Sequence, residues 1–277
     1  MNGAQKATKY IGIFIGVLLA IAILNAAIQG GIAVMRIFTD GSSQEEDFAQ
    51  SYTEDIRSLY IDGGAGEIRL VSAESWRVEA SDVTSGFRAQ VEGDTLRIRD
   101  GRSFFHFMVN RSPVITVYMP AQRLEEISLH LGAGRVSAQS LNADRVRLEG
   151  GAGEIEVASV TADDLRADLG VGQTTIRDAQ IGKLDISGGV GKCVFFGRLD
   201  GDADIDGGVG EILLTLNGRE EEYSYRIDNG IGETRLAGRR VGDEKTSHPN
   251  AVGTLDVDGG VGSIRIDFAE GKESTKD

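Results

Sequence analysis

The chain has 277 residues, enough for one large domain or two small ones with a sizeable core. Its 38 glycines and 3 prolines follow no Gly-X-Y period, which excludes a collagen-like fibre, and its net charge of −14 argues against a nucleic-acid-binding surface. A single cysteine, Cys193, excludes an intrachain disulfide framework.

The N-terminus predicts a membrane anchor. Residues 1–10 contain two lysines and no acid, and residues 11–35 form a run of 25 residues without a charge, long enough to span a bilayer as a helix. Because the basic side is the short one, we expect residues 1–10 in the cytoplasm and the C-terminal domain outside it, in a single-pass cell-membrane protein. A cleaved signal peptide with a cut near Ala26 is the alternative. Residues 36–56 are polar and predict a linker.

A repeat follows this linker. The motif Gly-x-Gly occurs eight times, flanked on both sides by alternating apolar residues. From Gly132 to Gly208 the spacing is 19 residues four times in succession, and it then increases to 22 and to 30. A fixed period of about 20 residues is typical of a solenoid, in which stacked units bury a continuous core.

Each repeat predicts two strands joined at a glycine corner. Positions five and three before the first glycine, and four and six after it, are mostly apolar, so the buried face changes phase at the motif. Such a change needs a bend, for which glycine supplies the backbone conformations. The predicted structural glycine corners are Gly64, Gly66, Gly132, Gly134, Gly151, Gly153, Gly170, Gly172, Gly189, Gly191, Gly208, Gly210, Gly230, Gly232, Gly260 and Gly262. We therefore expect an all-β fold, a single-stranded parallel β-solenoid (β-helix) of 19-residue coils over residues 57–268, preceded by one N-terminal transmembrane helix.

Five segments depart from the repeat. Phe87–Asp100 alternates around Gly93-Asp94 and predicts a hairpin, and Val114–Pro120 predicts a further strand. The apolar cluster Phe104–Met108 is expected to cap the first end of the solenoid, or else to lie on the membrane or a partner. Ala237–Gly253 is a polar insertion that explains the longest spacing, and residues 269–277 are charged and expected to be disordered.

These features resemble a bacterial "putative adhesin" family of β-strand-repeat proteins of unknown function, linked with toast-rack β-solenoid domains of envelope proteins. The resemblance rests on VEGDTLRIRD (Val91–Asp100), on VITVYMPAQRLEEISLHLGAGRVSAQSL (Val114–Leu141) and on the coils that follow, and it covers Arg57 to Phe268. It implies a solenoid fold and an envelope location. It offers no catalytic motif to carry over.

The glycines do not predict a nucleotide site. In GGVGKC (Gly188–Cys193) the first glycine of a P-loop is missing and a cysteine replaces its Ser or Thr, and a Rossmann fingerprint would continue as a helix where these repeats continue as strands. The calcium nonapeptide motif would need an aspartate where Ile155 and Ile212 stand. We therefore expect no nucleotide and no cofactor.

A row of acidic residues lies two positions before the first glycine of most repeats. Stacking would align them as a ladder on one outer face, with His130 and Ser187 in two coils. Ca²⁺ could bridge such carboxylates, although a solvated acidic stripe is the simpler interpretation, so no metal site is assigned. The ladder consists of Asp62, Glu149, Asp168, Asp206, Asp228 and Asp258.

The sequence gives little support for catalysis. The histidines His106, His130 and His248 share no metal-ligand spacing, and Cys193 falls in a column expected to be buried. We expect a non-enzymatic, membrane-anchored, extracytoplasmic scaffold or adhesin-like binding module, with an envelope protein, a wall polymer or a second copy as its partner. A regulatory component of an envelope-stress system, acting through its transmembrane helix, is the alternative. A polysaccharide-active β-helix enzyme is a third, weaker hypothesis.

Overall fold

The computed structural model describes residues 46–83, 86–100 and 113–269. These residues form twenty strands and one short 3-10 helix, η1 (Glu220–Glu222), with no α-helix in the described ranges. The strands are β1 (Glu46–Tyr52), β2 (Ser58–Asp62), β3 (Ala65–Ala73), β4 (Trp76–Val83), β5 (Arg88–Glu92), β6 (Thr95–Arg99), β7 (Val114–Pro120), β8 (Leu124–Ala138), β9 (Leu141–Val157), β10 (Val160–Asp168), β11 (Val171–Ser187), β12 (Val190–Leu199), β13 (Ala203–Asp206), β14 (Val209–Asn217), β15 (Tyr223–Asp228), β16 (Ile231–Leu236), β17 (Arg239–Val241), β18 (Glu244–Thr246), β19 (Gly253–Asp258) and β20 (Val261–Ala269).

The predicted anchor over residues 11–35, the Phe104–Met108 cluster and the tail beyond residue 269 lie outside the described residues, and their assignments stay predictions. Within the described ranges, no helix is long and apolar enough to cross a membrane.

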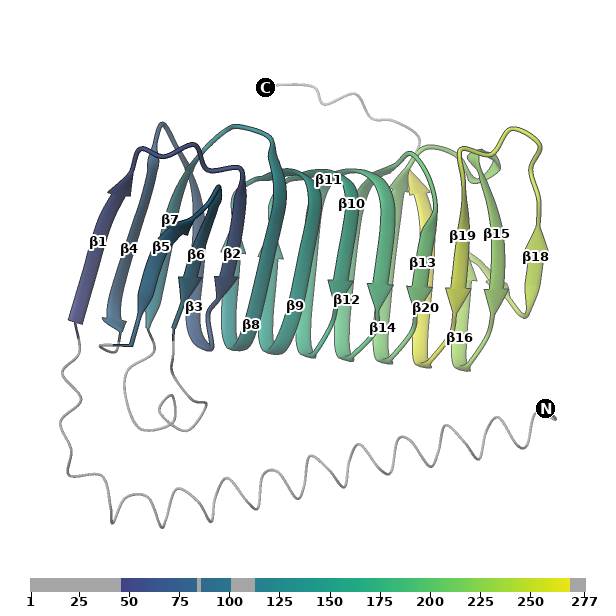
Figure 1. Cartoon of the computed structure of the whole chain (residues 1–277). Coiled ribbons are helices and arrows are strands. Elements are labelled where there is room, and N and C mark those ends of the chain that lie inside the picture. Colours follow the sequence, from purple (N-terminus) through teal and green to yellow (C-terminus); the bar gives the residue numbers. More distant parts are fainter. Residues whose placement is uncertain (1–45, 84–85, 101–112, 270–277) are drawn as a thin grey trace, which may run out of the picture.

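The strands stack into a flattened solenoid with two walls (Figure 1). Wall 1 contains, in spatial order, β6, β2, the first halves of β8 and β9, β10, the last half of β11, β13, β19 and β15. Wall 2 contains β1, β4, β7, β3, the last halves of β8 and β9, the first half of β11, β12, β14, β20 and β16. Away from the ends the strands of each wall are parallel, as predicted for a β-solenoid.

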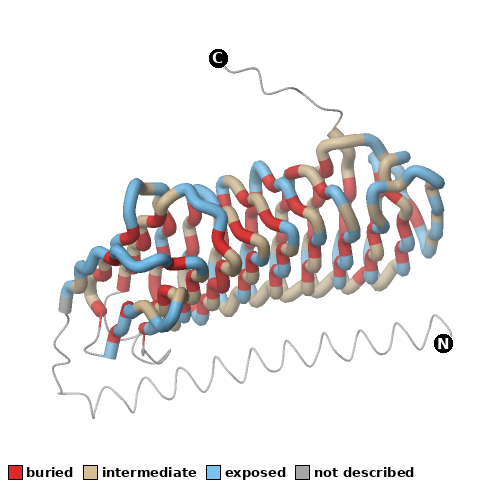
Figure 2. The backbone as a smooth tube through the Cα atoms, turned by 45° about the horizontal axis from the view of Figure 1, so that its top comes forward, coloured by how far each residue is buried: buried red, intermediate tan, exposed pale blue. Residues whose placement is uncertain are grey.

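The core lies between the walls and consists of the predicted inward columns. In wall 1 these columns include Leu165 and Ile205, and in wall 2 they include Val157 and Phe195, all fully buried. Figure 2 shows the same alternation of buried and exposed residues along each coil. A 19-residue coil cannot bury its apolar face alone, so the stability of each coil depends on its neighbours.

The order of stacking differs from the chain order at both ends. The last coil, β19 and β20, lies between β13–β14 and β15–β16, although it follows both in the sequence. Likewise β2 lies between β6 and β8. Successive coils therefore do not stack in sequence order at the ends, because the apolar columns of all coils are alike and do not specify which neighbour a coil selects.

Antiparallel strands close both ends of the solenoid. The predicted hairpin forms as β5–β6, and the predicted strand Val114–Pro120 is β7. At the first end of wall 2, β1 pairs with β4. β1 lies within residues 36–56, the segment expected to be a polar linker, and its Tyr52 is buried in the core. At the other end, the insertion supplies β17 beside β16 and β18 beside β15. These strands cover edges that could otherwise pair with other chains.

Candidate functional site

The glycine corners align along one long edge of the solenoid, which we call the glycine edge. Successive copies of the motif are in register, so that Gly153 lies between Gly134 and Gly172. The second glycine of each motif has a positive φ, for example +148° at Gly153 and +139° at Gly210. A side chain rarely adopts this conformation, so the corner depends on glycine.

Close packing between coils is a second reason for glycine at this edge. A Cβ added at Gly153 would lie 1.8 Å from the carbonyl oxygen of Gly134, and one added at Gly210 would lie 1.9 Å from that of Gly191. The motif is thus explained by backbone geometry and coil stacking. It needs no bound phosphate.

A small cavity lies under the glycine edge. Its lining includes the corner glycines and the inward side chains of Ile155, Thr174, Cys193 and Ile212, and its volume is about 50 Å³. This is room for about one or two water molecules, whereas ligand pockets usually have about 300–1,000 Å³. A ligand of this edge would therefore have to bind outside the wall.

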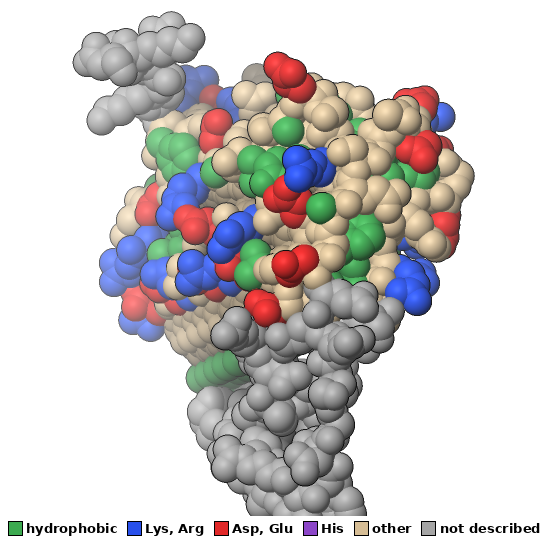
Figure 3. Space-filling view, turned by 90° about the vertical axis from the view of Figure 1, so that its left-hand side faces the viewer, with side chains coloured by type: hydrophobic (Ala, Val, Ile, Leu, Met, Phe, Trp, Pro, Cys, Tyr) green, Lys and Arg blue, Asp and Glu red, His purple; other side chains and the backbone are tan. Residues whose placement is uncertain are grey.

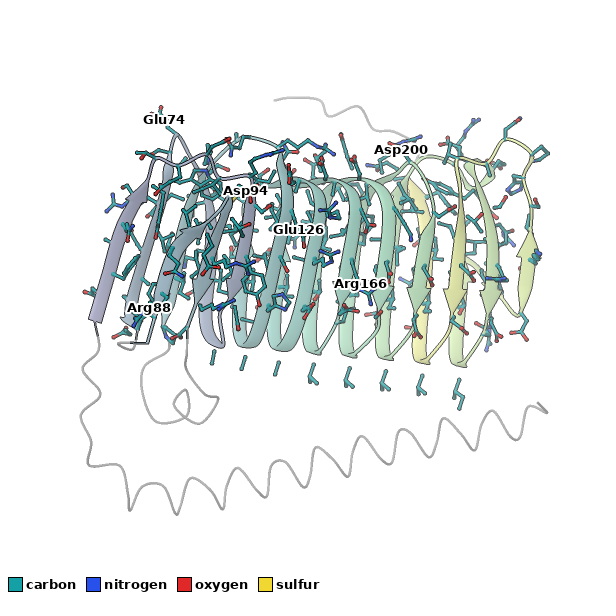
Figure 4. The ribbon with its side chains drawn as sticks, viewed as in Figure 1. Glu74, Arg88, Asp94, Glu126, Arg166 and Asp200 are labelled. Atoms are coloured by element: carbon teal, nitrogen blue, oxygen red, sulfur yellow. The ribbon has the colours of Figure 1, made fainter. Side chains whose placement is uncertain are left out.

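The outer face of wall 1 presents the predicted ladder as one row of side chains. The row continues from β6 to β15, in a different order from the sequence. Its members in space are Arg99, Asp62, His130, Glu149, Asp168, Ser187, Asp206, Asp258 and Asp228. A second outward row lies beside it, two residues earlier on each strand. Together the two rows give wall 1 a continuous polar surface (Figure 4).

In the half of wall 1 near the first end, three side chains form a hydrogen-bonded chain. His130 Nε2 lies 3.0 Å from Ser128 Oγ, and His130 Nδ1 lies 2.7 Å from Glu149 Oε2. Sequence reasoning noted His130 and Glu149 as ladder members and missed Ser128. The signal was available, because Ser128 precedes His130 by two residues on one strand face and Glu149 follows it by one 19-residue period.

This serine–histidine–glutamate chain has the order of a catalytic triad but not its surroundings. Ser128 is only 7 % exposed, and β8 pairs with strands on both sides. The backbone N–H groups of β8 form hydrogen bonds with the neighbouring strands. They therefore cannot form the oxyanion hole that supplies much of the rate in acyl transfer. We interpret these three hydrogen-bonded side chains as a network that orders the polar surface of wall 1.

An aromatic and basic cluster adjoins this network. The ring of Tyr60 lies 5.0 Å from that of His130, and the guanidinium groups of Arg97 and Arg99 lie 5.2 and 5.9 Å from the centre of the Tyr60 ring. Ion pairs continue along the wall. Arg166 Nε lies 3.0 Å from Asp168, and this bonding to Arg166 lowers the pKa of the Asp168 carboxyl.

The other half of wall 1 is acidic. Asp206, Asp258 and Asp228 occupy consecutive positions of the ladder, and Asp204 and Asp256 occupy the row beside them. Partial desolvation, and then the charges of Asp258 and Asp204, raise the pKa of the Asp206 carboxyl. Arg226 forms an ion pair with Asp256 in this region. The described residues contain no group of three or more His, Cys, Asp or Glu side chains that could hold a metal ion.

Neutralising Asp206 is expected to stabilise the protein slightly at neutral pH. The folded state raises the pKa of this carboxyl, so its ionised form is disfavoured by folding, and the penalty disappears as pH falls through the folded pKa. Asp206→Asn should therefore raise the free energy of unfolding by about 0.5 kcal/mol at neutral pH and have no effect in acid. Chemical denaturation at both pH values measures this.

The matched control for that variant is Asp168→Asn in the same row. Arg166 lowers the pKa of Asp168, which stabilises the fold above the unfolded-state pKa and is lost as pH falls through the folded pKa. The Asp168 variant should thus be less stable at neutral pH. A loss of stability in the Asp206 variant as well would contradict the assignment of repulsion to this half of wall 1.

Comparisons with known proteins agree with this architecture. The sequence model of the Toastrack DUF4097 family matches residues 56–270. A crystal structure described as a "putative adhesin" from Bacteroides fragilis is 18% identical, with a TM-score of 0.54, and the match covers 81% of this chain and 98% of that one. A second such structure, from Parabacteroides distasonis, is 14% identical over 81% of this chain and 98% of that one, with a TM-score of 0.41. No curated protein has a significant sequence match. At 18% identity, the likeness to the Bacteroides fragilis structure shows the fold alone.

Proposed function

The chain belongs to the Toastrack DUF4097 family, and on that premise we propose that it is a non-catalytic binding or scaffold module held at the outer face of the cell membrane. The neighbours named as adhesins support a binding module in general terms. The membrane location is supported by the sequence, through the uncharged residues 11–35 and the basic segment before them.

The polar surface of wall 1 is the observation that carries the binding proposal. Nine strands align their outward side chains in two parallel rows, about 4.8 Å apart from coil to coil. The Tyr60 cluster provides aromatic and basic groups at one end, and the Asp204–Asp206 region provides carboxylates at the other. Such a surface matches an extended partner with repeating polar groups: an envelope protein, a wall polymer or a second copy of this chain.

Photo-crosslinking in intact cells tests this proposal. A photoreactive amino acid replaces Arg166, which lies at the centre of wall 1, and in a control it replaces Arg265, which is exposed on the outer face of wall 2. We expect a defined crosslinked product from position 166 that is absent or much weaker from position 265. Equal products from both walls, or none from wall 1, would reject wall 1 as the binding surface.

A regulatory protein that acts through its transmembrane helix is the second candidate function. In this hypothesis the signal would pass through contacts of residues 11–35 within the membrane. Replacing these residues by an unrelated membrane-spanning helix separates the two hypotheses. A scaffold should keep its wall 1 crosslink and its cellular role after the exchange, whereas a regulator should lose its role.

A further inference from the structure

The residue between the two glycines of each motif points away from the core. These residues form one row along the glycine edge, which we call the apolar ridge, and Figure 4 shows a single row of short side chains projecting below the ribbon there. The register of wall 2 places them in line. The members in spatial order are Ala65, Ala133, Ala152, Val171, Val190, Val209, Val261 and Ile231.

The ridge is aliphatic in every coil, and its exposed or half-buried part runs from Ala152 to Ile231, since Ala65 and Ala133 are buried at 1% and 6% exposure. Among the described residues, Val171 and Ile231 are two of the four large hydrophobic side chains that are exposed, at 49% and 36%. The other outward rows contain charges, such as Glu154 and Lys192 in the row that follows the second glycine. An apolar row of this kind on a surface marks an interaction site more often than a chance arrangement.

Backbone preference does not explain the ridge. Threonine has the shape and the β-branching of valine, and would suit an extended residue between two glycines equally well. It occurs at none of the eight positions, whereas Thr174 and Thr234 occur inside the solenoid. The property common to all eight ridge residues is that they are apolar.

The flanking glycines make the ridge protrude. With no side chains on either side, the aliphatic groups stand above a band of backbone, and the end-on view shows hydrophobic atoms along the lower edge beside such a band (Figure 3). The six positions from Ala152 to Ile231, at a spacing of about 4.8 Å, give a straight line about 24 Å long but only one side chain wide. A stable protein dimer buries about 800 Å² per partner, which so narrow a line does not provide.

The chain enters the described structure at this same edge, whereas β20 ends at the opposite turns. β1 begins at the glycine edge, since Glu46 pairs with Val83 at the lower end of β4 (Figure 1). Only ten residues separate position 35, the end of the predicted anchor, from Glu46, a distance of about 40 Å at most. The anchor would therefore join the domain at the glycine edge.

We propose that the apolar ridge rests on the surface of the lipid bilayer, so that the solenoid lies along the membrane on its glycine edge. This inference rests on the proposed membrane anchoring. The protruding aliphatic groups enter the headgroup–acyl boundary, as in other interfacial proteins. The acidic ladder on the wall 1 flank would be repelled by anionic lipids, so a zwitterionic lipid is the appropriate probe.

The test uses the full chain in phosphatidylcholine nanodiscs, one copy per disc. Val209→Cys on the ridge is labelled with an environment-sensitive fluorophore, and Ser140→Cys at the opposite turn is the matched control. The native Cys193 is buried, and burial raises the pKa of its thiol to about 12. Cys193 should therefore not react with the fluorophore, and only the introduced cysteine is labelled. We expect lipids with a nitroxide near the headgroup to remove most of the emission from position 209 and little from position 140.

Further variants decide between the possible occupants of the ridge. Val190→Glu should restore emission from position 209 by lifting the edge off the lipid, while the isosteric Val190→Thr should do so less. If the chain enters the disc but lipids do not quench the fluorophore at position 209, the ridge proposal is overturned and the anchoring is not. Quenching that appears only with two copies per disc would also overturn the ridge proposal. A chain that does not enter discs overturns the anchoring, and the ridge proposal with it.

Discussion

Gly210→Ala is expected to destabilise the solenoid by about 3–5 kcal/mol, or about 10–15 °C in Tm. The φ of Gly210 is +139°, and its Cβ would lie 1.9 Å from the carbonyl oxygen of Gly191 in the adjacent coil. The variant would have both a strained backbone and a clash with backbone that cannot move without opening the stack. Thermal unfolding followed by circular dichroism measures the change.

Two other glycines provide matched controls. An added Cβ at Gly242 meets nothing within 4 Å, and the backbone there lies outside the positive-φ region, so Gly242→Ala should cost nothing. Gly93 has a φ of +67° but also has open space around it, so Gly93→Ala should cost only the backbone strain, about 1–2 kcal/mol. If Gly210→Ala were no more harmful than Gly93→Ala, close coil packing would not be what requires glycine at the corners.

Ile266→Asp in β20 should unfold more of the protein than its own coil. Ile266 is fully buried and pairs with Leu214 on one side and Leu236 on the other. A buried unpaired carboxylate costs about 3–5 kcal/mol, enough to detach the last coil. Since that coil lies between β14 and β16, residues 223–246 would lose their neighbour. Hydrogen exchange should show lost protection over 223–246 as well as 253–269.

The neighbouring position Arg265 provides the control for this variant. Its side chain is exposed on the outer face of β20, so Arg265→Asp should leave protection of both segments unchanged. Protection retained over residues 223–246 in the Ile266 variant would mean that this coil packs directly on the coil before it in the sequence. The interleaved order would then be wrong.

The fold was largely predictable because its local determinants recur. Apolar residues at alternating positions specify the inward columns, and the phase change at Gly-x-Gly specifies the corner, as Ile205, Gly208 and Ile212 illustrate. The interleaving of β19 was not predictable in this way. Its Leu255 and Val257 would fit beside β13 or beyond β15 equally well, and long-range pairing decides between the two.

The candidate sites were only partly predictable, for a similar reason. The ladder row follows from the period, but the Ser128–His130–Glu149 network joins side chains of two strands, and Asp258 meets Asp206 only through the interleaved coil. The ridge residues were visible as the small residue within each motif. A sequence shows that each of these residues lies between two glycines, but only the direction in which the corners bend shows that the row of side chains faces outward.

The interleaved last coil also determines when this end of the protein can form during synthesis. Residues 223–236 leave the ribosome before residues 253–269. They cannot take their place in the stack until residues 253–269 are made, because residues 253–269 form the coil between them and β13–β14. Until then the edge of β13 and β14 is unpaired, and an unpaired parallel edge can recruit a strand from another nascent chain. Synthesis of residues 253–269 is thus the event that seals this end of the solenoid.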